Sequence, residues 1–275
     1  MYDPPAYIWA ITIAATAAIA AAACIVLYSG AIRAGLGRRR AALLAGAAAA
    51  VLGGWFTATV VIAGHGWYHT RLGHGVPWLP IAVAGFFGTL LALRQIPVVA
   101  RALAAPGLAS RLEYPHLFRV EGVVFLILMA LGQLPALFAW PAGLGDIAAG
   151  IAAPLVAYRL ARGTGRRAAR WHNAFGITDL VVALTLGALT GFQLLTITPS
   201  AAPLFGLPLA LIVTAGVPLL LALHIASMSA LAKAPRTPLP ATGPLIAGPA
   251  PGTAVADTPA TAWPGEIRVF LSASE

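Results

Sequence analysis

Arginines gather in alternate connections between seven long apolar runs, and this alternation constrains the fold more than any other feature of the chain. A membrane-spanning helix needs roughly 20 predominantly apolar residues. The sequence therefore predicts an all-α polytopic membrane helix bundle of seven transmembrane helices within residues 1–233. The seven runs cover residues 7–28, 41–64, 76–93, 118–138, 141–160, 174–195 and 204–231.

The positive charge predicts the orientation of this bundle. Connections after the first, third and fifth runs, and the start of the tail, hold clustered basic residues, whereas connections after the even-numbered runs hold only Arg71. Short basic loops stay on the cytoplasmic side of a membrane. We therefore expect the N-terminus outside, the C-terminus in the cytoplasm, and a multi-pass protein of the bacterial cytoplasmic (inner) membrane.

The composition excludes several other classes of protein. Charged residues make up only 9% of the chain, against roughly 25% in an ordinary soluble domain. The formal net charge is +9, and the basic residues responsible for it lie in loops beside the apolar runs. This placement indicates membrane topology rather than nucleic-acid binding. Membrane lipids are the expected partners, nucleic acid is not a partner, and a homo-oligomer is compatible with the sequence. The single cysteine, Cys24, permits no internal disulfide.

Residues 234–275 form a separate tail rich in Pro, Ala, Thr and Gly. Such a composition buries too little apolar surface to order itself. We expect a disordered cytoplasmic extension, for which a cytoplasmic protein is a candidate partner.

Three carboxyl groups lie within or at the edge of the apolar runs, at Glu121, Asp146 and Asp179. An ionised carboxylate at membrane depth costs at least about 2.5–3.5 kcal/mol on insertion scales. It persists when it faces a cavity, pairs with a cation, caps a helix or stays protonated. The candidate substrate- or ion-binding residues are these acids and their polar neighbours in the sequence, namely Arg119, Asn173 and His224.

Each acid keeps a structural alternative. Glu121, near the cytoplasmic end of the fourth run, can reach loop arginines, although Arg119 lies two residues away and points to another helix face. Asp179, about 9 Å inside the cytoplasmic edge by helical rise, needs a buried partner. Its candidate partners are His172, Asn173, His224 or an arginine.

Asp146 follows a cluster of helix breakers. Two prolines, two glycines and an expected tight corner at residues 139–140 precede it, so Asp146 can cap a helix that begins at Ile147. From Ile147 to Leu160 such a helix would rise only about 21 Å, too short to cross the membrane. The sequence then predicts irregular backbone at residues 141–145, against protein or a water-filled cavity. It also predicts that Asp146 lies in the outer half and the other candidate acids in the cytoplasmic half.

Residues 143–151 and 176–184 share a pattern, Gly-x-x-Asp-aliphatic-x-x-small-aliphatic, in spans expected to run in opposite directions. Inverted repeats with interrupted helices mark binding sites in many transporters. This pattern favours a site at Asp146 and Asp179.

Three histidines, His65, His69 and His74, crowd one short loop on the expected outer side. His65 and His69 are four residues apart, a spacing that suits one metal ion on one helical face. Four neighbouring glycines argue against a stable helix, and neither Cys nor an acid completes a ligand set. Metal or haem binding and a solvated, pH-sensitive loop are the two alternatives, and no cofactor is predicted.

Two motifs carry a resemblance to known proteins: Leu134-Pro-x-x-Phe-Ala-x-Pro-Ala-Gly-x-Gly-Asp146 and Gly176-x-x-Asp179-Leu. With the Arg119-x-Glu-Gly segment, they resemble an uncharacterised family of multi-pass bacterial, actinobacterial-like integral membrane proteins. The resemblance covers residues 94–228 and implies an inner-membrane protein without an assigned activity.

The sequence leaves three classes of function open, and whether the protein is an enzyme is uncertain. The leading hypothesis is a small-solute or ion/proton permease-like protein that uses its intramembrane acids. The second is an intramembrane enzyme acting on a lipid or isoprenoid, in which acids kept protonated in an apolar cavity act as general acids. The third is a structural or sensory membrane partner protein.

Overall fold

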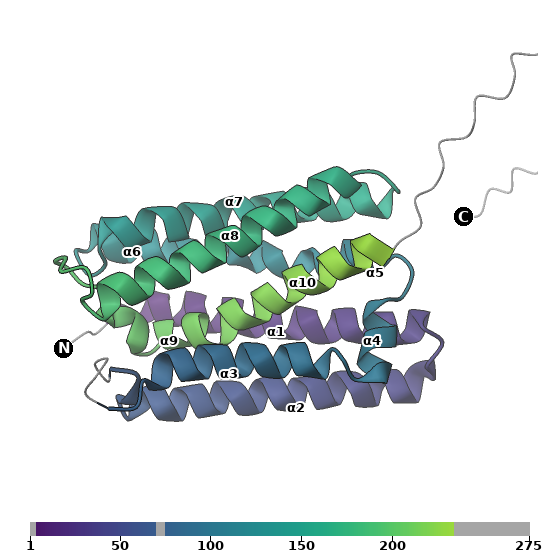
Figure 1. Cartoon of the computed structure of the whole chain (residues 1–275), viewed down its shortest axis with the longest axis horizontal. Helices are drawn as coiled ribbons and strands as arrows, with labels where there is room; N and C mark the ends of the chain where they lie inside the picture. The colour runs from purple at the N-terminus through teal and green to yellow at the C-terminus, as the bar shows by residue number, and fades with distance from the viewer. Residues whose placement is uncertain (1–3, 70–74, 234–275) are drawn as a thin grey trace, which may run out of the picture. The chain divides into compact units, whose positions relative to one another are not determined.

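The computed structural model describes residues 4–69 and 75–233, and these residues form helices and no strand (Figure 1). The expected all-α fold is therefore confirmed for this part of the chain. Its longer helices are α1 (Ala6–Arg33), α2 (Gly37–Gly64), α3 (Trp78–Leu93), α7 (Ala136–Ala161), α8 (Arg166–Gly191) and α10 (Val217–Lys233). The shorter ones are η1 (Trp67–His69), α4 (Pro97–Leu103), α5 (Leu108–Leu112), η2 (Tyr114–Gly122), α6 (Val123–Ala130), η3 (Ala202–Phe205), α9 (Leu209–Leu211) and η4 (Ile212–Gly216).

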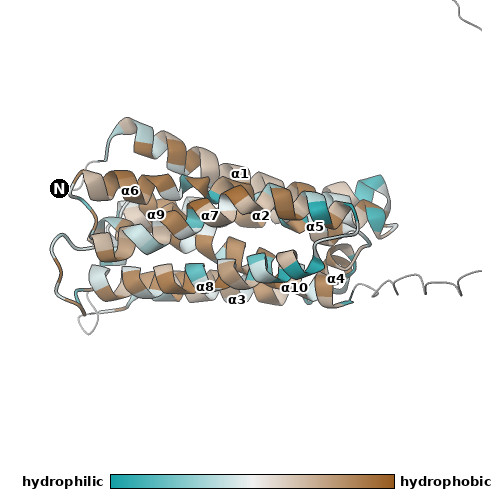
Figure 2. Cartoon of the chain, turned by 90° about the horizontal axis from the view of Figure 1, so that it is seen from above, coloured by the Kyte–Doolittle hydropathy of each residue, from teal (hydrophilic) through white to brown (hydrophobic). Residues whose placement is uncertain are grey.

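Five helices in the described residues are long and apolar enough to cross a membrane: α1, α2, α7, α8 and the segment Leu209–Lys233. A sixth span results if α3 and α4, which meet at 85°, are counted as one bent span. Apolar residues run along the helices and hydrophilic ones gather toward one end of the bundle (Figure 2). The chain is thus an all-helical protein with the apolar helices of a membrane-embedded protein.

The C-terminal helical segment is the core of the bundle. Inside the apolar window of Leu209–Lys233, 83% of the residues are buried, against 11% in the window of α2. A helix that is apolar on all faces suits such a central place. The segment widens to a π-helix at η4, where Trp55 Nε1 donates a hydrogen bond to the Thr214 carbonyl oxygen at 2.8 Å. A π-turn offers backbone carbonyls to side chains from other helices.

The expected corner at residues 139–140 was wrong, because the chain turns earlier, at residues 131–135. Gly132 has a φ of 70°, and the Gln133 N–H donates to the Leu128 carbonyl at 2.8 Å, which closes α6 in a Schellman motif. Pro135 then precedes the first residue of α7. The Gly132-to-Pro135 stretch was therefore the helix-stop signal.

Helix α7 runs without a break through residues 139–145, with Pro141 inside it. The prediction of irregular backbone there, and of Asp146 as the cap of a helix beginning at Ile147, was wrong. Proline is tolerated inside membrane helices because neighbouring groups satisfy the freed carbonyl. Asp146 consequently lies inside the helix, about 15 Å along α7 by helical rise.

The other boundaries also differ from the apolar runs. The fourth run was expected at 118–138, but its helical segment consists of η2 and α6 and ends at Ala130. Helix α8 begins at Arg166 rather than at residue 174, so His172 and Asn173 lie inside a helix and not in a loop. The apolar run that corresponds to α8 is shorter than the helix because the helix also contains buried polar residues, which interrupt the run.

Two expectations fall on residues outside the described ranges. These are the disordered tail at 234–275 and His74 of the outer loop.

Gly30 lies where α1 packs closely against the α4–α5 region. A Cβ at Gly30 would stand 2.5 Å from the Ala102 carbonyl oxygen, whereas a Cβ at Gly46 would meet nothing within 4 Å. Gly30→Ala is therefore expected to lower the free energy of unfolding by about 1–3 kcal/mol, the usual range for overpacking. Gly46→Ala, the matched control, should be neutral or stabilising because alanine favours helix. Thermal unfolding of the purified protein in detergent measures both, and equal midpoints for the two variants would contradict this packing.

Candidate functional site

A buried guanidinium, that of Arg119 in η2, joins two of the candidate acids. Arg119 is 0% exposed. Its Nε donates to Asp146 Oδ1 of α7 at 2.7 Å, and its Nη2 donates to Asp179 Oδ2 of α8. Its Nη1 donates to His224 Nε2 of α10 at 3.2 Å. Since a guanidinium presents its donors in a rigid planar fork, one side chain ties four helical elements together.

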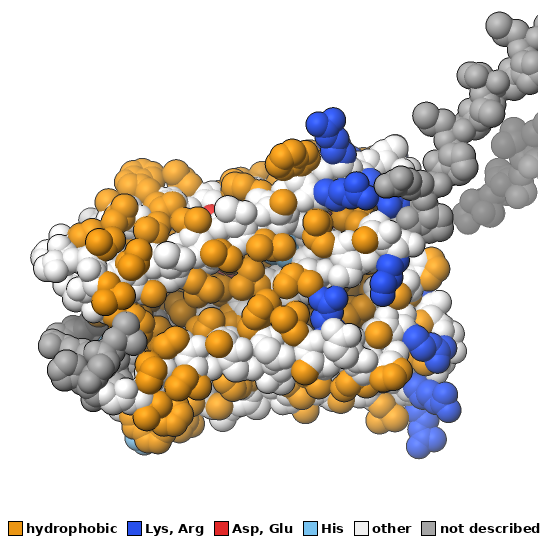
Figure 3. Space-filling view, viewed as in Figure 1, with side chains coloured by type: hydrophobic (Ala, Val, Ile, Leu, Met, Phe, Trp, Pro, Cys, Tyr) orange, Lys and Arg blue, Asp and Glu red, His pale blue; other side chains and the backbone are white. Residues whose placement is uncertain are grey.

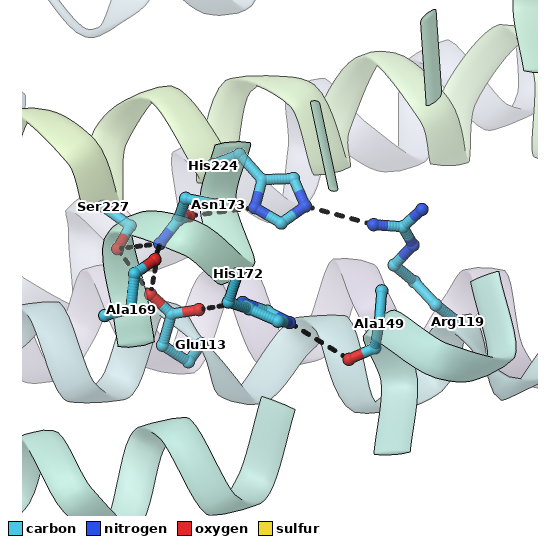
Figure 4. A network of polar contacts seen from close by, with 8 residues as sticks. All are labelled: Glu113, Arg119, Ala149, Ala169, His172, Asn173, His224 and Ser227. Carbon is cyan, nitrogen blue, oxygen red and sulfur yellow. Dashed lines mark hydrogen bonds and ion pairs between the residues drawn. The ribbon is translucent and has the colours of Figure 1, made fainter. Parts of the chain in front are cut away.

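From Arg119 the polar contacts continue through His224 and Asn173 to Glu113 (Figure 4). Because Arg119 donates to His224 Nε2, the ring is assigned as the neutral tautomer whose Nδ1–H donates to Asn173 Oδ1 at 2.9 Å. The Asn173 amide donates to Glu113 Oε1 at 2.7 Å, and the Ser227 hydroxyl donates to the same oxygen at 2.6 Å. We call these residues, with His172, Asp146 and Asp179, the Arg119 network.

The other oxygen of Glu113 faces His172. His172 Nδ1 lies 2.8 Å from Glu113 Oε2, and His172 Nε2 lies 3.1 Å from the Ala149 carbonyl oxygen. Both ring nitrogens therefore have an oxygen partner, and one hydrogen is shared between His172 Nδ1 and Glu113 Oε2. Glu113, which is 0% exposed, thus forms a buried pair with His172.

Glycines let the helices approach closely around Arg119. A Cβ on Gly145 would overlap the Asp179 carboxyl, and a Cβ on Gly176 would overlap the His224 ring. The shared Gly-x-x-Asp pattern therefore reflects close packing around one arginine. The helices that hold it, α7 and α8, are both uninterrupted, unlike the broken helices that the pattern suggested.

Two buried polar groups beside the network have no hydrogen-bond partner among the described residues. The His116 ring stacks on His224 at a centroid distance of 3.7 Å, and neither of its nitrogens is bonded. Glu121 is 4% exposed with its Oε2 unbonded, so it is a buried acid that forms no ion pair with a loop arginine among the described residues. Unsatisfied buried groups are rare in native proteins and often lie at functional places.

The structure brings together five of the sequence-predicted candidates and leaves Glu121 alongside them without a bond to Arg119. The five are Arg119, Asp146, Asn173, Asp179 and His224. Asp146 and Asp179 were expected in opposite halves of the membrane, yet they share one guanidinium. The two acids meet near the middles of α7 and α8, and the membrane half assigned to each stays a prediction.

The outer histidines are separate from this network. His65 Nδ1 bonds the Val61 carbonyl oxygen at 2.7 Å, and the His69 ring lies against Phe205. Within residues 4–69 and 75–233, no group of three or more His, Cys, Asp or Glu side chains is arranged to hold a metal ion.

Sequence reasoning missed Glu113, His116 and Ser227, and treated His172 only as a partner for Asp179. Glu113 and His116 were assigned to an arginine-rich loop. The available signal was a spacing of three residues in this segment. His116, Arg119 and Gly122 recur every third residue, which is the repeat of the 3₁₀-helix that η2 forms.

Asp146 also reaches a cavity of about 450 Å³ bounded by parts of α3, α6, α7, α8, η3, η4 and α10. The rest of its lining is apolar apart from Thr185 and a glycine. The network thus meets an apolar space at one carboxyl group.

Fold and site together define an all-helical protein with the apolar helices of a membrane protein and a buried arginine–acid–histidine network. Residues 76–232 match a family described as a domain of unknown function (DUF8737). Because the match covers more than half of the chain, the chain belongs to this family. The matched segment holds the whole Arg119 network, whereas α1 and α2 precede it. No curated protein and no solved structure matches the chain.

Replacing the arginine tests the energetics of the network. Arg119→Met leaves Asp146 and Asp179 without a counter-charge, so the free energy of unfolding is expected to fall by about 3–5 kcal/mol. Adding Asp146→Leu and Asp179→Leu should restore most of this loss, because a hydrophobic replacement removes the unpaired charges. Chemical or thermal unfolding in detergent measures both.

The control for this series is Arg94→Met. Arg94 is half-buried and donates to Ser229 Oγ at 3.1 Å, and it forms no ion pair with an acid among the described residues. Its loss should cost about 1 kcal/mol or less. Equal losses for Arg94→Met and Arg119→Met would contradict a special role for the buried ion pairs.

Proposed function

We propose that this protein is a bacterial inner-membrane permease that moves a small solute or ion, with proton uptake at the acids around Arg119. The observation that carries the proposal is the imbalance of charge there. One buried guanidinium contacts two carboxyls, and a third, Glu121, lies buried beside them. Ionised acids at membrane depth are costly and mark ion and proton pathways. An acid surplus of this kind favours binding of a proton or a cation.

Protonation of one acid offers a physical route to a conformational change. Arg119 holds α7 through Asp146 and α8 through Asp179. A protonated carboxyl loses its charge attraction to the guanidinium, so the two helices are no longer held equally. The hydrogen bonds from Arg119 to His224 and on to Asn173 carry the change to α10 and back into α8. Transport by alternating access requires such a movement of one helix group against another.

Seven spans follow if α3 and the η2–α6 segment each cross the membrane. The nine 3₁₀ residues of η2 rise about 2.0 Å each and the eight residues of α6 about 1.5 Å each, so the segment reaches about 30 Å, the thickness of the hydrocarbon core. Lysine and arginine side chains gather toward one end of the face seen in Figure 3. Under the positive-inside rule that end is cytoplasmic, which favours an N-terminus outside.

Proton flux into vesicles tests the permease. Purified protein in liposomes is expected to let protons enter under a valinomycin–potassium potential faster than empty liposomes, read by pyranine in the lumen. Asp146→Asn and Asp179→Asn should each lower the protein-dependent rate of proton entry about tenfold or more. An amide cannot bind and release a proton, so each change removes one proton-binding group from the intramembrane pathway. Asp257→Asn, an acid-to-amide change in the tail, is the control and should leave the rate unchanged. Unaltered rates in both network variants, with the proteins folded, would rule out the proposed role of the acids.

Cysteine labelling tests the orientation. In a Cys24→Ala background, Thr196→Cys lies in the α8–η3 connection and Thr164→Cys in the α7–α8 connection. A membrane-impermeant maleimide added to intact cells is expected to label the first and not the second, since basic loops stay inside. Labelling of Thr164→Cys alone would reverse the orientation, and labelling of neither before cell lysis would contradict an exposed α8–η3 connection.

An intramembrane enzyme acting on a lipid or isoprenoid is the second candidate. The apolar cavity beside Asp146 favours it, because a protonated carboxyl in an apolar space is a competent general acid. Turnover of a co-purified lipid, detected by mass spectrometry and abolished in Asp146→Asn, would select this candidate over the permease.

A further inference from the structure

The cavity beside Asp146 is a defined apolar space between α3 and α8. Its volume of about 450 Å³ falls in the range of roughly 300–1,000 Å³ typical of small-molecule sites. It extends along α8 from Leu180 to Leu189 and on to Phe192 just after the helix, so it leads from the level of Asp146 toward the end of the bundle where η3 lies. The face in Figure 3 is covered mainly by hydrophobic side chains and is hollowed between these helices.

The cavity offers a ligand acceptors and no free donor. Asp146 Oδ1 accepts from Arg119, while Asp146 Oδ2 has no hydrogen-bond partner among the described residues. The other polar side chain of the lining, Thr185, donates its hydroxyl hydrogen to the Val181 carbonyl oxygen at 2.8 Å. A polar ligand group in this cavity therefore has to be a donor or a cation.

The surrounding charges favour a cation. Arg119 is 0% exposed, and its Nε, Nη1 and Nη2 are directed at Asp146, His224 and Asp179, so its positive charge is not presented to the cavity. Three acids, Asp146, Asp179 and Glu121, lie near this single arginine. An anionic lipid headgroup would face an uncompensated carboxylate in an apolar space, which is unfavourable.

We infer that this cavity binds a lipophilic organic cation, with the cationic centre against the Asp146 carboxylate and the apolar body along α3 and α8. This inference deepens the proposed function, and it rests on that function only in treating the bound cation as the transport substrate. The site itself rests on the cavity, the unbonded Asp146 oxygen and the buried arginine.

Binding of tetraphenylphosphonium to the purified full-length protein in a neutral detergent tests the site. Tetraphenylborate has nearly the same shape with the opposite charge and serves as the matched probe. We expect tetraphenylphosphonium to bind in equilibrium dialysis at least about tenfold more tightly than tetraphenylborate, relative to protein-free micelles. Equal affinities would mean an apolar surface without charge selectivity and would overturn the inference.

Two variants locate the binding. Asp146→Asn keeps the size of the side chain but removes its charge, so affinity for tetraphenylphosphonium should fall about tenfold or more. Ala183→Phe fills the cavity without replacing any charged group and should abolish binding. Ala48→Phe is the control, because Ala48 lines a separate apolar groove of about 220 Å³ bounded in part by α1 and α2. This variant should bind tetraphenylphosphonium like the parent.

The outcomes separate this inference from the proposed function. Binding that survives both Asp146→Asn and Ala183→Phe in folded protein overturns the cavity as the site. Loss of binding in Ala48→Phe alone would place the cation in the other groove and also overturn it. Specific binding without proton flux in liposomes would leave the cation site standing and remove the permease, whereas flux without binding would do the reverse.

Discussion

The burial of one guanidinium among acids is the interaction on which the rest of this structure depends. Arg119 is closed off from solvent in the centre of the bundle and reaches α7, α8 and α10 at once. In a low-dielectric interior each of these charges is costly alone and acceptable only with its partners. The helices α7, α8 and α10 must therefore pack at the heights that bring their polar side chains to Arg119. The position of Arg119 in η2 thus constrains how these helices pack.

Small residues make this arrangement sterically possible. Around the network, glycines of α7 and α8 stand where any Cβ would meet a side chain of the network, as at Gly145 and Gly176. Helices in a membrane associate through close packing and interhelical hydrogen bonds, since lipid provides no hydrophobic driving force between them. The same residues that look like packing in the sequence thus determine where the acids point. They leave one face of Asp146 toward an apolar cavity and the opposite side toward Arg119.

The two halves of the site differ in how their polar groups are satisfied. The Glu113–His172 side is a satisfied pair in which both oxygens of Glu113 have hydrogen-bond partners. The Asp146–Asp179 side has more acid than base and adjoins an apolar space, and Glu121 and His116 lie next to the network with unbonded polar atoms. A satisfied pair suits a structural role, whereas surplus charge suits binding of a proton or cation. This contrast is the basis of the proposed permease, in which one end of the network would hold the helices and the other would change its protonation state.

Hydrophobic runs were enough to establish an all-helical chain with membrane-type helices, because period and length are local properties. The acids themselves could be picked out from the sequence for the same reason: a carboxyl in an apolar run is conspicuous wherever the run folds. Helix ends near Gly132 and Arg166 were misplaced, since a proline inside α7 and polar residues inside α8 imitate the ends of helices. Which charges meet was decided only by the tertiary structure, because Arg119, Asp146, Asp179 and His224 lie on four elements and pair through packing that no spacing along the chain encodes. Glu113 and His116 became part of the site in the same way, through the burial of a segment whose composition reads as a loop.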